Sequence, residues 1–256
     1  MIEVKKISGV HNYCNRWCER CRFANRCEVA LHEAKSKIHA SDKNVWDTVQ
    51  SNLNEAFELL KSMLKEMEED FENTISDEIS NHDLIAPQKL TAEISAPKKE
   101  LFLHINKTSK DYGFAAINWF DNTEDILKIK EEQLNQLHNI GAKDIIHEAQ
   151  ILKEAISIVE WNMFLIGAKL NRATADDDFP MIDDDPIQTD ANGSAKVALI
   201  AIDDSLAAWN IIRETIPELS DESLDMLAML SRLKKDSLKA FPDAHKFIRP
   251  GFDTEE

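Results

Sequence analysis

Four cysteines within fourteen residues are the part of this sequence whose type and spacing point most directly to chemistry. Cys14, Cys18, Cys21 and Cys27 follow the spacing C-x3-C-x2-C-x5-C and are the only cysteines of the chain. On a helix the first three would fall at i, i+4 and i+7, on one face, and Cys27 could return after a bend. Thiolates bind zinc tetrahedrally or hold an iron–sulfur cluster, and four of them complete either site. We therefore expect these four residues to be the ligands of one metal centre.

The spacing favours an iron–sulfur cluster of the 4Fe-4S type over zinc. Zinc ribbons use two C-x2-C pairs separated by a dozen or more residues, whereas this chain has one such pair, Cys18 with Cys21. Disulfides and free thiols remain alternatives, although an intracellular compartment disfavours disulfides. His11 and His32 flank the cysteines and are candidates to replace one of them or to donate a hydrogen bond to a sulfur.

The cysteine spacing invites comparison with known families. The C-x3-C-x2-C portion resembles the cluster motif of radical S-adenosylmethionine enzymes in three positions, but no alternating strands and helices follow it here, and Cys27 is available as a fourth ligand. Zinc-binding anti-sigma factors are similar in their x3-Cys-x2-Cys ligands, with histidine in place of Cys14. The fuller string YCNRWCERC, with Phe23, Arg26 and Cys27, resembles the N-terminus of an uncharacterised bacterial protein family. That resemblance implies a metal site and no particular reaction.

The charge of the chain is unevenly distributed. The formal net charge is −17, yet residues 1–27 contain six basic and two acidic residues. A basic segment with Trp17 and Phe23 is an alternative site for nucleic-acid binding, in which the rings would stack on bases. We expect instead that both rings shield the metal and dock the segment on the helices, because the acidic remainder would repel a long polyanion.

Carboxylates inside apolar helical segments offer a second possible site. Asp203 and Asp204 interrupt one such segment, and Glu160 interrupts another together with Asn162. Facing carboxylates could form an acid/base pair or bind a second metal, so an enzyme with this site is an alternative function. The acidic stretch 174–194 has no EF-hand spacing and is expected to be a solvated loop.

Composition and periodicity predict an all-α fold. The chain is 43 % hydrophobic with 6 Gly and 7 Pro among 256 residues, which favours long helices with few turns. We expect an elongated helical bundle of about five to seven helices with a small N-terminal four-cysteine metal-binding segment. The expected domains are 1–40 (cysteine segment), 41–245 (bundle) and 246–256 (irregular tail). The expected helices are 28–40, 42–74, 98–121, a shorter one from 123 that stops before Gly141, 143–173, 194–215 and 220–240, with a linker over 80–98.

The same features lead to an expected location and role. The sequence opens without a signal peptide and contains no run of eighteen apolar residues, so we expect a cytoplasmic protein that does not enter a membrane. The expected function is metal binding, with a structural, redox-sensing or electron-transfer role. A protein partner is expected to bind the helical bundle, and nucleic acid is not expected as a partner.

Overall fold

A computed structural model describes residues 5–40, 96–142, 144–175 and 185–253. It divides the chain into two compact units, residues 1–7 with 18–92 and residues 8–17 with 93–256. The described residues form five α-helices, short 3₁₀ turns and loops, without a strand, and the all-α prediction is therefore confirmed. The helix expected over 42–74 lies outside the described residues, as does most of the linker expected over 80–98.

In the first unit, the described elements are two 3₁₀ turns and one helix. Cys18–Arg20 forms η1, Ala24–Arg26 forms η2, and Glu28–Ala40 forms α1. The helix has the bounds that the sequence predicts. Cys27 stands between η2 and α1, and its carbonyl accepts the hydrogen bond from Leu31 N at 3.1 Å that belongs to the first turn of the helix.

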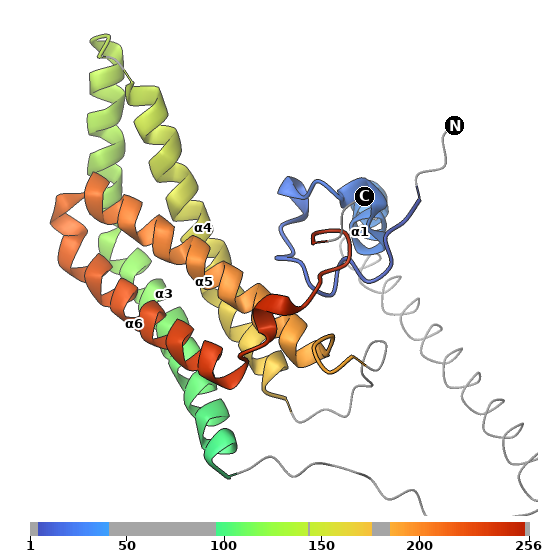
Figure 1. Ribbon diagram of the computed structural model, residues 1–256. Coiled ribbons are helices and arrows are strands. Elements are labelled where there is room, and N and C mark those ends of the chain that lie inside the picture. The colour runs from blue at the N-terminus through green and yellow to red at the C-terminus, as the bar shows by residue number, and fades with distance from the viewer. Residues whose placement is uncertain (1–4, 41–95, 143, 176–184, 254–256) are drawn as a thin grey trace, which may run out of the picture. The chain divides into compact units, whose positions relative to one another are not determined.

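In the second unit, four helices form a bundle (Figure 1). Each helix packs against two others: α3 and α5 are both neighbours of α4, and both are also neighbours of α6. Figure 1 shows α3 and α4 continuing beyond the ends of α5 and α6. The helices are α3 (Ala96–Asn139), α4 (Ile145–Ala173), α5 (Asp190–Thr215) and α6 (Ser220–Ala240). No helix of the described residues is long and apolar enough to cross a bilayer.

Helix α3 corrects the prediction of two separate helices over this region. The sequence suggested that Thr123 caps a new helix, yet α3 runs without a break through 44 residues. Thr123 is buried, and its hydroxyl donates to the carbonyl of Trp119 four residues earlier at 2.7 Å. A threonine that satisfies its hydroxyl inside the helix in this way no longer acts as a cap. The helix ends instead at Gly141, whose φ of 75° allows the left-handed turn after it.

The remaining helix boundaries lie near their predicted positions. Helix α4 begins two residues after the expected start, and α6 begins at Ser220 as expected. Helix α5 begins at Asp190, four residues earlier than predicted, because the Thr189 side chain accepts the hydrogen bond of Asn192 N at 3.1 Å and caps the helix.

The bundle core follows the predicted apolar faces. From the face predicted for α4, Val159, Ile166 and Leu170 are fully buried. Trp209 of α5 lies at the centre of the core, where its ring meets that of Trp119 edge-on and its Nε1 donates to Tyr112 Oη at 3.1 Å. Burial raises the pKa of Tyr112 to about 12, although the hydrogen bonds to Trp209 and Ser205 act in the opposite direction.

Candidate metal centre

Cys14 lies in the second unit, in an irregular segment where its sulfur takes part in two hydrogen bonds. The backbone N–H of Arg16 donates to Cys14 Sγ at 3.3 Å, and the thiol donates to the carbonyl of His11 at 3.4 Å. Arg16 has a φ of 60°, which is rare for a residue with a side chain. The left-handed conformation at Arg16 therefore accompanies an amide directed at the sulfur, and such N–H···S bonds are among the features that tune metal–thiolate centres.

The prediction that Cys14, Cys18 and Cys21 share one α-helix is wrong. The residues after Cys14 form a turn in which the Asn15 side chain accepts a hydrogen bond from Trp17 N at 3.2 Å. An asparagine that binds the backbone two residues further on favours a turn over a helix, and the left-handed Arg16 prevents helical continuation.

Tyr13 anchors this segment on the N-terminal turn of α5. Its hydroxyl donates to Asp190 Oδ1 at 2.9 Å, and its ring packs on Phe247 with 4.6 Å between ring centroids. Burial and the Asp190 carboxylate raise the pKa of Tyr13 far above its usual range. Gly193 lies beneath both rings, and only a residue without a Cβ leaves them room.

Helix α4 holds the two sides of the same segment. The Trp17 ring stacks on Trp161 with 5.1 Å between centroids and 11° between planes, and Trp161 Nε1 donates to the carbonyl of Asn15 at 2.7 Å. One helix further along, Lys169 Nζ donates to the carbonyl of Asn12 at 2.8 Å. The backbone around Cys14 is thus held from both sides by α4.

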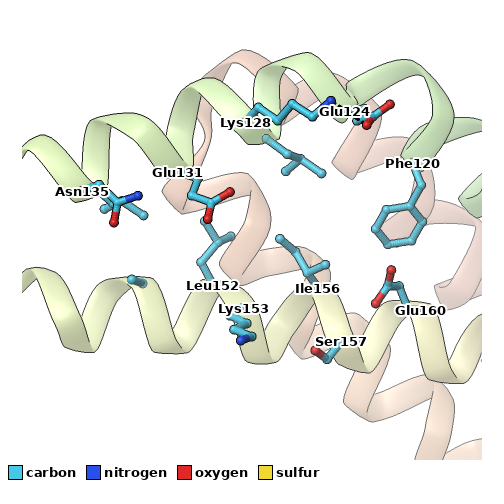
Figure 2. Close-up of a pocket in the computed structure, with 13 residues that line it drawn as sticks. Phe120, Glu124, Lys128, Glu131, Asn135, Leu152, Lys153, Ile156, Ser157 and Glu160 are labelled. Atoms are coloured by element: carbon cyan, nitrogen blue, oxygen red, sulfur yellow. Dashed lines mark ion pairs between the residues drawn. The ribbon is translucent and has the colours of Figure 1, made fainter.

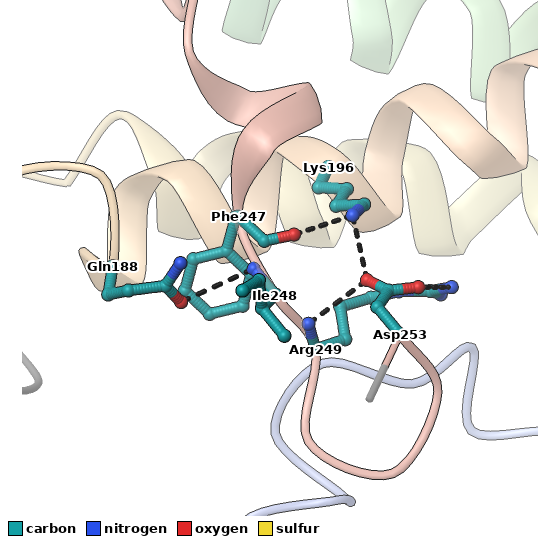
Figure 3. A network of polar contacts seen from close by, with 6 residues as sticks. All are labelled: Gln188, Lys196, Phe247, Ile248, Arg249 and Asp253. Atoms are coloured by element: carbon teal, nitrogen blue, oxygen red, sulfur yellow. Dashed lines mark hydrogen bonds and ion pairs between the residues drawn. The ribbon is translucent and has the colours of Figure 1, made fainter. Parts of the chain in front are cut away.

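The C-terminal segment supports Tyr13 from the opposite side (Figure 3). Lys196 Nζ donates to the carbonyl of Phe247 and to Asp253 Oδ2, and Arg249 makes a bidentate pair with the same carboxylate. Burial raises the pKa of Asp253, but the hydrogen bonds from Arg249 and Lys196 outweigh it and hold this pKa well below its usual range. The tail predicted to be irregular is indeed not helical after residue 246, yet Phe247 is buried.

The other three cysteines belong to the first unit, where successive short turns contain them. Cys21 N donates to the carbonyl of Cys18 at 3.2 Å, and Ala24 N donates to the carbonyl of Cys21 at 3.2 Å. Cys27 is buried, while Cys18 and Cys21 are partly exposed. Tight turns of this kind let closely spaced thiols converge on one point, as metal-binding loops require.

The four cysteines, all of which lie in the described part of the chain, form no disulfide with one another. Within the described residues, no three His, Cys, Asp or Glu side chains are already gathered as a ligand set. The donor chemistry fits a metal centre, because four thiols within fourteen residues are a complete soft ligand set. His11 contacts Cys14 through its backbone carbonyl, and His32 lies on α1.

The structure does not bring together the three carboxylates proposed as a second site. Asp203 forms an ion pair with Lys234 of α6. Asp204 lines a cavity of about 470 Å³ between α4 and α5, where partial burial and the neighbouring Asp203 raise its pKa. Glu160 instead lines a groove of about 640 Å³ between α3 and α4, beside Phe120 (Figure 2). Neither cavity contains all three residues, so their geometry does not support a shared acid/base site.

The rings proposed for base stacking already have intramolecular contacts. Trp17 stacks on Trp161, as described above, and Phe23 is buried with the Arg22 guanidinium 4.5 Å from its ring centroid. The expectation that Trp17 docks its segment on the helices agrees with this contact. The arrangement therefore gives no specific support to nucleic-acid binding through stacked bases.

Three residues that position Cys14 were missed by the sequence analysis: Trp161, Lys169 and Gly193. Lys169 had a readable signal, because Ile151, Ala155, Ile158 and Leu165 form an apolar flank of α4 that continues to position 169. A lysine on such a flank must either reach solvent or find a polar partner. Trp161 and Gly193 had no comparable signal, because their partners lie 144 or more residues away in the sequence.

Comparison with known proteins adds no functional assignment to this geometry. No family model, no curated protein and no solved structure matches the chain. The functional argument consequently rests on the residues of this chain alone.

Proposed function

We propose that the protein binds one metal centre through Cys14, Cys18, Cys21 and Cys27, and that the centre is an iron–sulfur cluster of the 4Fe-4S type rather than zinc. The observation that carries the proposal is the hydrogen bond from Arg16 N to Cys14 Sγ. It places a donor where a ligand thiolate needs one, in a segment that Tyr13 and α4 hold in position. The ligand spacing supports the cluster over zinc, as argued above.

The role that follows from four protein ligands is not substrate turnover at the metal. A centre with four thiolates has no vacant coordination position for a substrate, which favours a structural, redox-sensing or electron-transfer role. In this proposal the helical bundle binds a protein partner that exchanges electrons with the centre or responds to its state.

Single Cys→Ser substitutions test whether the four cysteines act as one ligand set. Cys14→Ser, Cys18→Ser, Cys21→Ser and Cys27→Ser should each lose most of the metal of the wild-type protein, because each removes one of four thiolates. Metal and sulfide content per chain after anaerobic purification is the measurement. His11→Ala is the matched control and should keep the full content.

The variants also distinguish between possible ligand sets. A Cys14→Ser protein with full metal content would show that Cys14 is not a ligand and would contradict the four-cysteine centre. A His11→Ala protein that loses its metal would move the fourth ligand to the histidine. Zinc in place of iron and sulfide would retain the ligand set and overturn the choice of cluster.

A further inference from the structure

Lys169 of α4 is a buried lysine without a carboxylate partner among the described residues. It is 8 % exposed, and its only hydrogen-bond acceptor in the described part of the chain is the carbonyl of Asn12 at 2.8 Å. An ammonium group has three donors, and lysine is rarely buried unless it is paired with an opposite charge. The hydrogen bond to a neutral carbonyl leaves the charge of Lys169 uncompensated.

The surroundings of Lys169 contain more positive than negative charge. Burial lowers the pKa of Lys169, Arg172 and Arg16 act in the same direction, and Cys14 and Asp190 oppose them. Asp190 is already engaged by a bidentate pair with Arg172. Cys14 is therefore the anionic group that remains for Lys169, and it raises the pKa of Lys169 more than Asp190 does.

A four-thiolate metal centre would supply the missing negative charge. Four thiolates outweigh the positive charge of Zn²⁺ or of an iron–sulfur core, so that either centre is a net anion. A buried cation beside it would offset part of the cost of removing both charges from water. The same cation would favour the reduced cluster, which carries one more negative charge than the oxidised cluster.

We propose that Lys169 is the charge partner of the cysteine centre, and that its ammonium group stabilises the anionic metal–thiolate group and raises the reduction potential of a bound cluster. This inference rests on the proposed function, because it requires a centre that includes Cys14. It assigns to α4 a positioning and tuning role: the hydrogen bond to the Asn12 carbonyl holds the segment, and the charge acts on the metal.

Three substitutions separate the charge of Lys169 from its hydrogen bond. Lys169→Met removes both, Lys169→Gln keeps a donor for the Asn12 carbonyl without the charge, and Lys169→Arg keeps the charge. Lys153→Met is the matched control, since Lys153 is an exposed lysine of the same helix. Metal-loaded proteins are compared by the reduction potential of the cluster or, for zinc, by competition with a chelator.

The charge proposal predicts a distinct pattern over these variants. Lys169→Met and Lys169→Gln should both lower the potential, or weaken zinc binding by about ten- to a hundredfold, as outer residues of metal sites do. Lys169→Arg and Lys153→Met should stay near wild type. Folded, metal-loaded Lys169→Met with an unchanged potential or affinity would overturn the inference alone, and so would rescue by Lys169→Gln. Wild-type protein that binds no metal would overturn the proposed function, and this inference with it.

Discussion

Gly193→Ala is expected to destabilise the second unit by about 2 kcal/mol, although alanine is normally the better residue in a helix. A Cβ at position 193 would lie 2.6 Å from Tyr13 Cδ1 and 2.7 Å from Phe247 Cζ, closer than real Cβ contacts. Both rings are buried, so neither can move without disturbing its neighbours. Overpacking of this kind costs about 1–3 kcal/mol, more than the helix propensity of alanine returns. Chemical denaturation followed by tryptophan fluorescence measures the change.

Gly167→Ala is the matched control for this substitution. Gly167 also lies within a helix, but a Cβ there would be 3.8 Å from its nearest neighbour, Ser109 Oγ, which is an ordinary contact. Alanine at this position should therefore stabilise the protein by about 0.5–1 kcal/mol. Equal effects of the two substitutions would contradict the close packing of Tyr13 and Phe247 on Gly193.

Trp161→Ala is expected to cost about 2 kcal/mol and to release residues 15–17 from α4. The substitution removes the stacked contact with Trp17 and the hydrogen bond from Nε1 to the carbonyl of Asn15. An aromatic pair contributes about 0.5–1.5 kcal/mol beyond its buried area, and a hydrogen bond contributes a similar amount. Unfolding free energy and hydrogen exchange at the amides of residues 15–17 measure the two effects.

Phe164→Ala provides the comparison for Trp161→Ala on the same helix. The Phe164 ring is 61 % exposed, so its removal should change the unfolding free energy by no more than about 0.5 kcal/mol. If Trp161→Ala were as mild as Phe164→Ala, with unchanged exchange at residues 15–17, the clamp on the Cys14 segment would be disproved.

The fold was predictable where apolar residues repeat with the period of a helix. The face of α4 that contains Val159, Ile166 and Leu170 was predicted from spacing, and these side chains are buried. The error at Thr123 has a local cause: a threonine followed by acidic residues also fits a helix start, and only the burial of its hydroxyl shows that α3 continues. Burial depends on contacts between helices, which the local sequence does not specify.

The candidate ligands were predictable from residue type and spacing, whereas the residues that hold them were not. The helical placement of the first three cysteines failed because Asn15 and Arg16 together form a turn. Asparagine tolerates both caps and turns, and a left-handed arginine has no sequence signature. The contacts of Tyr13 with Asp190 and of Asn12 with Lys169 span more than 150 residues, and no local pattern encodes them.

Metal analysis of the wild-type protein, purified without oxygen, is the measurement that tests the four-cysteine centre most directly. The visible absorbance spectrum is recorded together with the iron, sulfide and zinc content per chain. The account predicts a brown protein with about four iron and four sulfide ions per chain, as a 4Fe-4S cluster requires. A colourless, folded protein that contains no metal and takes up neither iron with sulfide nor zinc would contradict it.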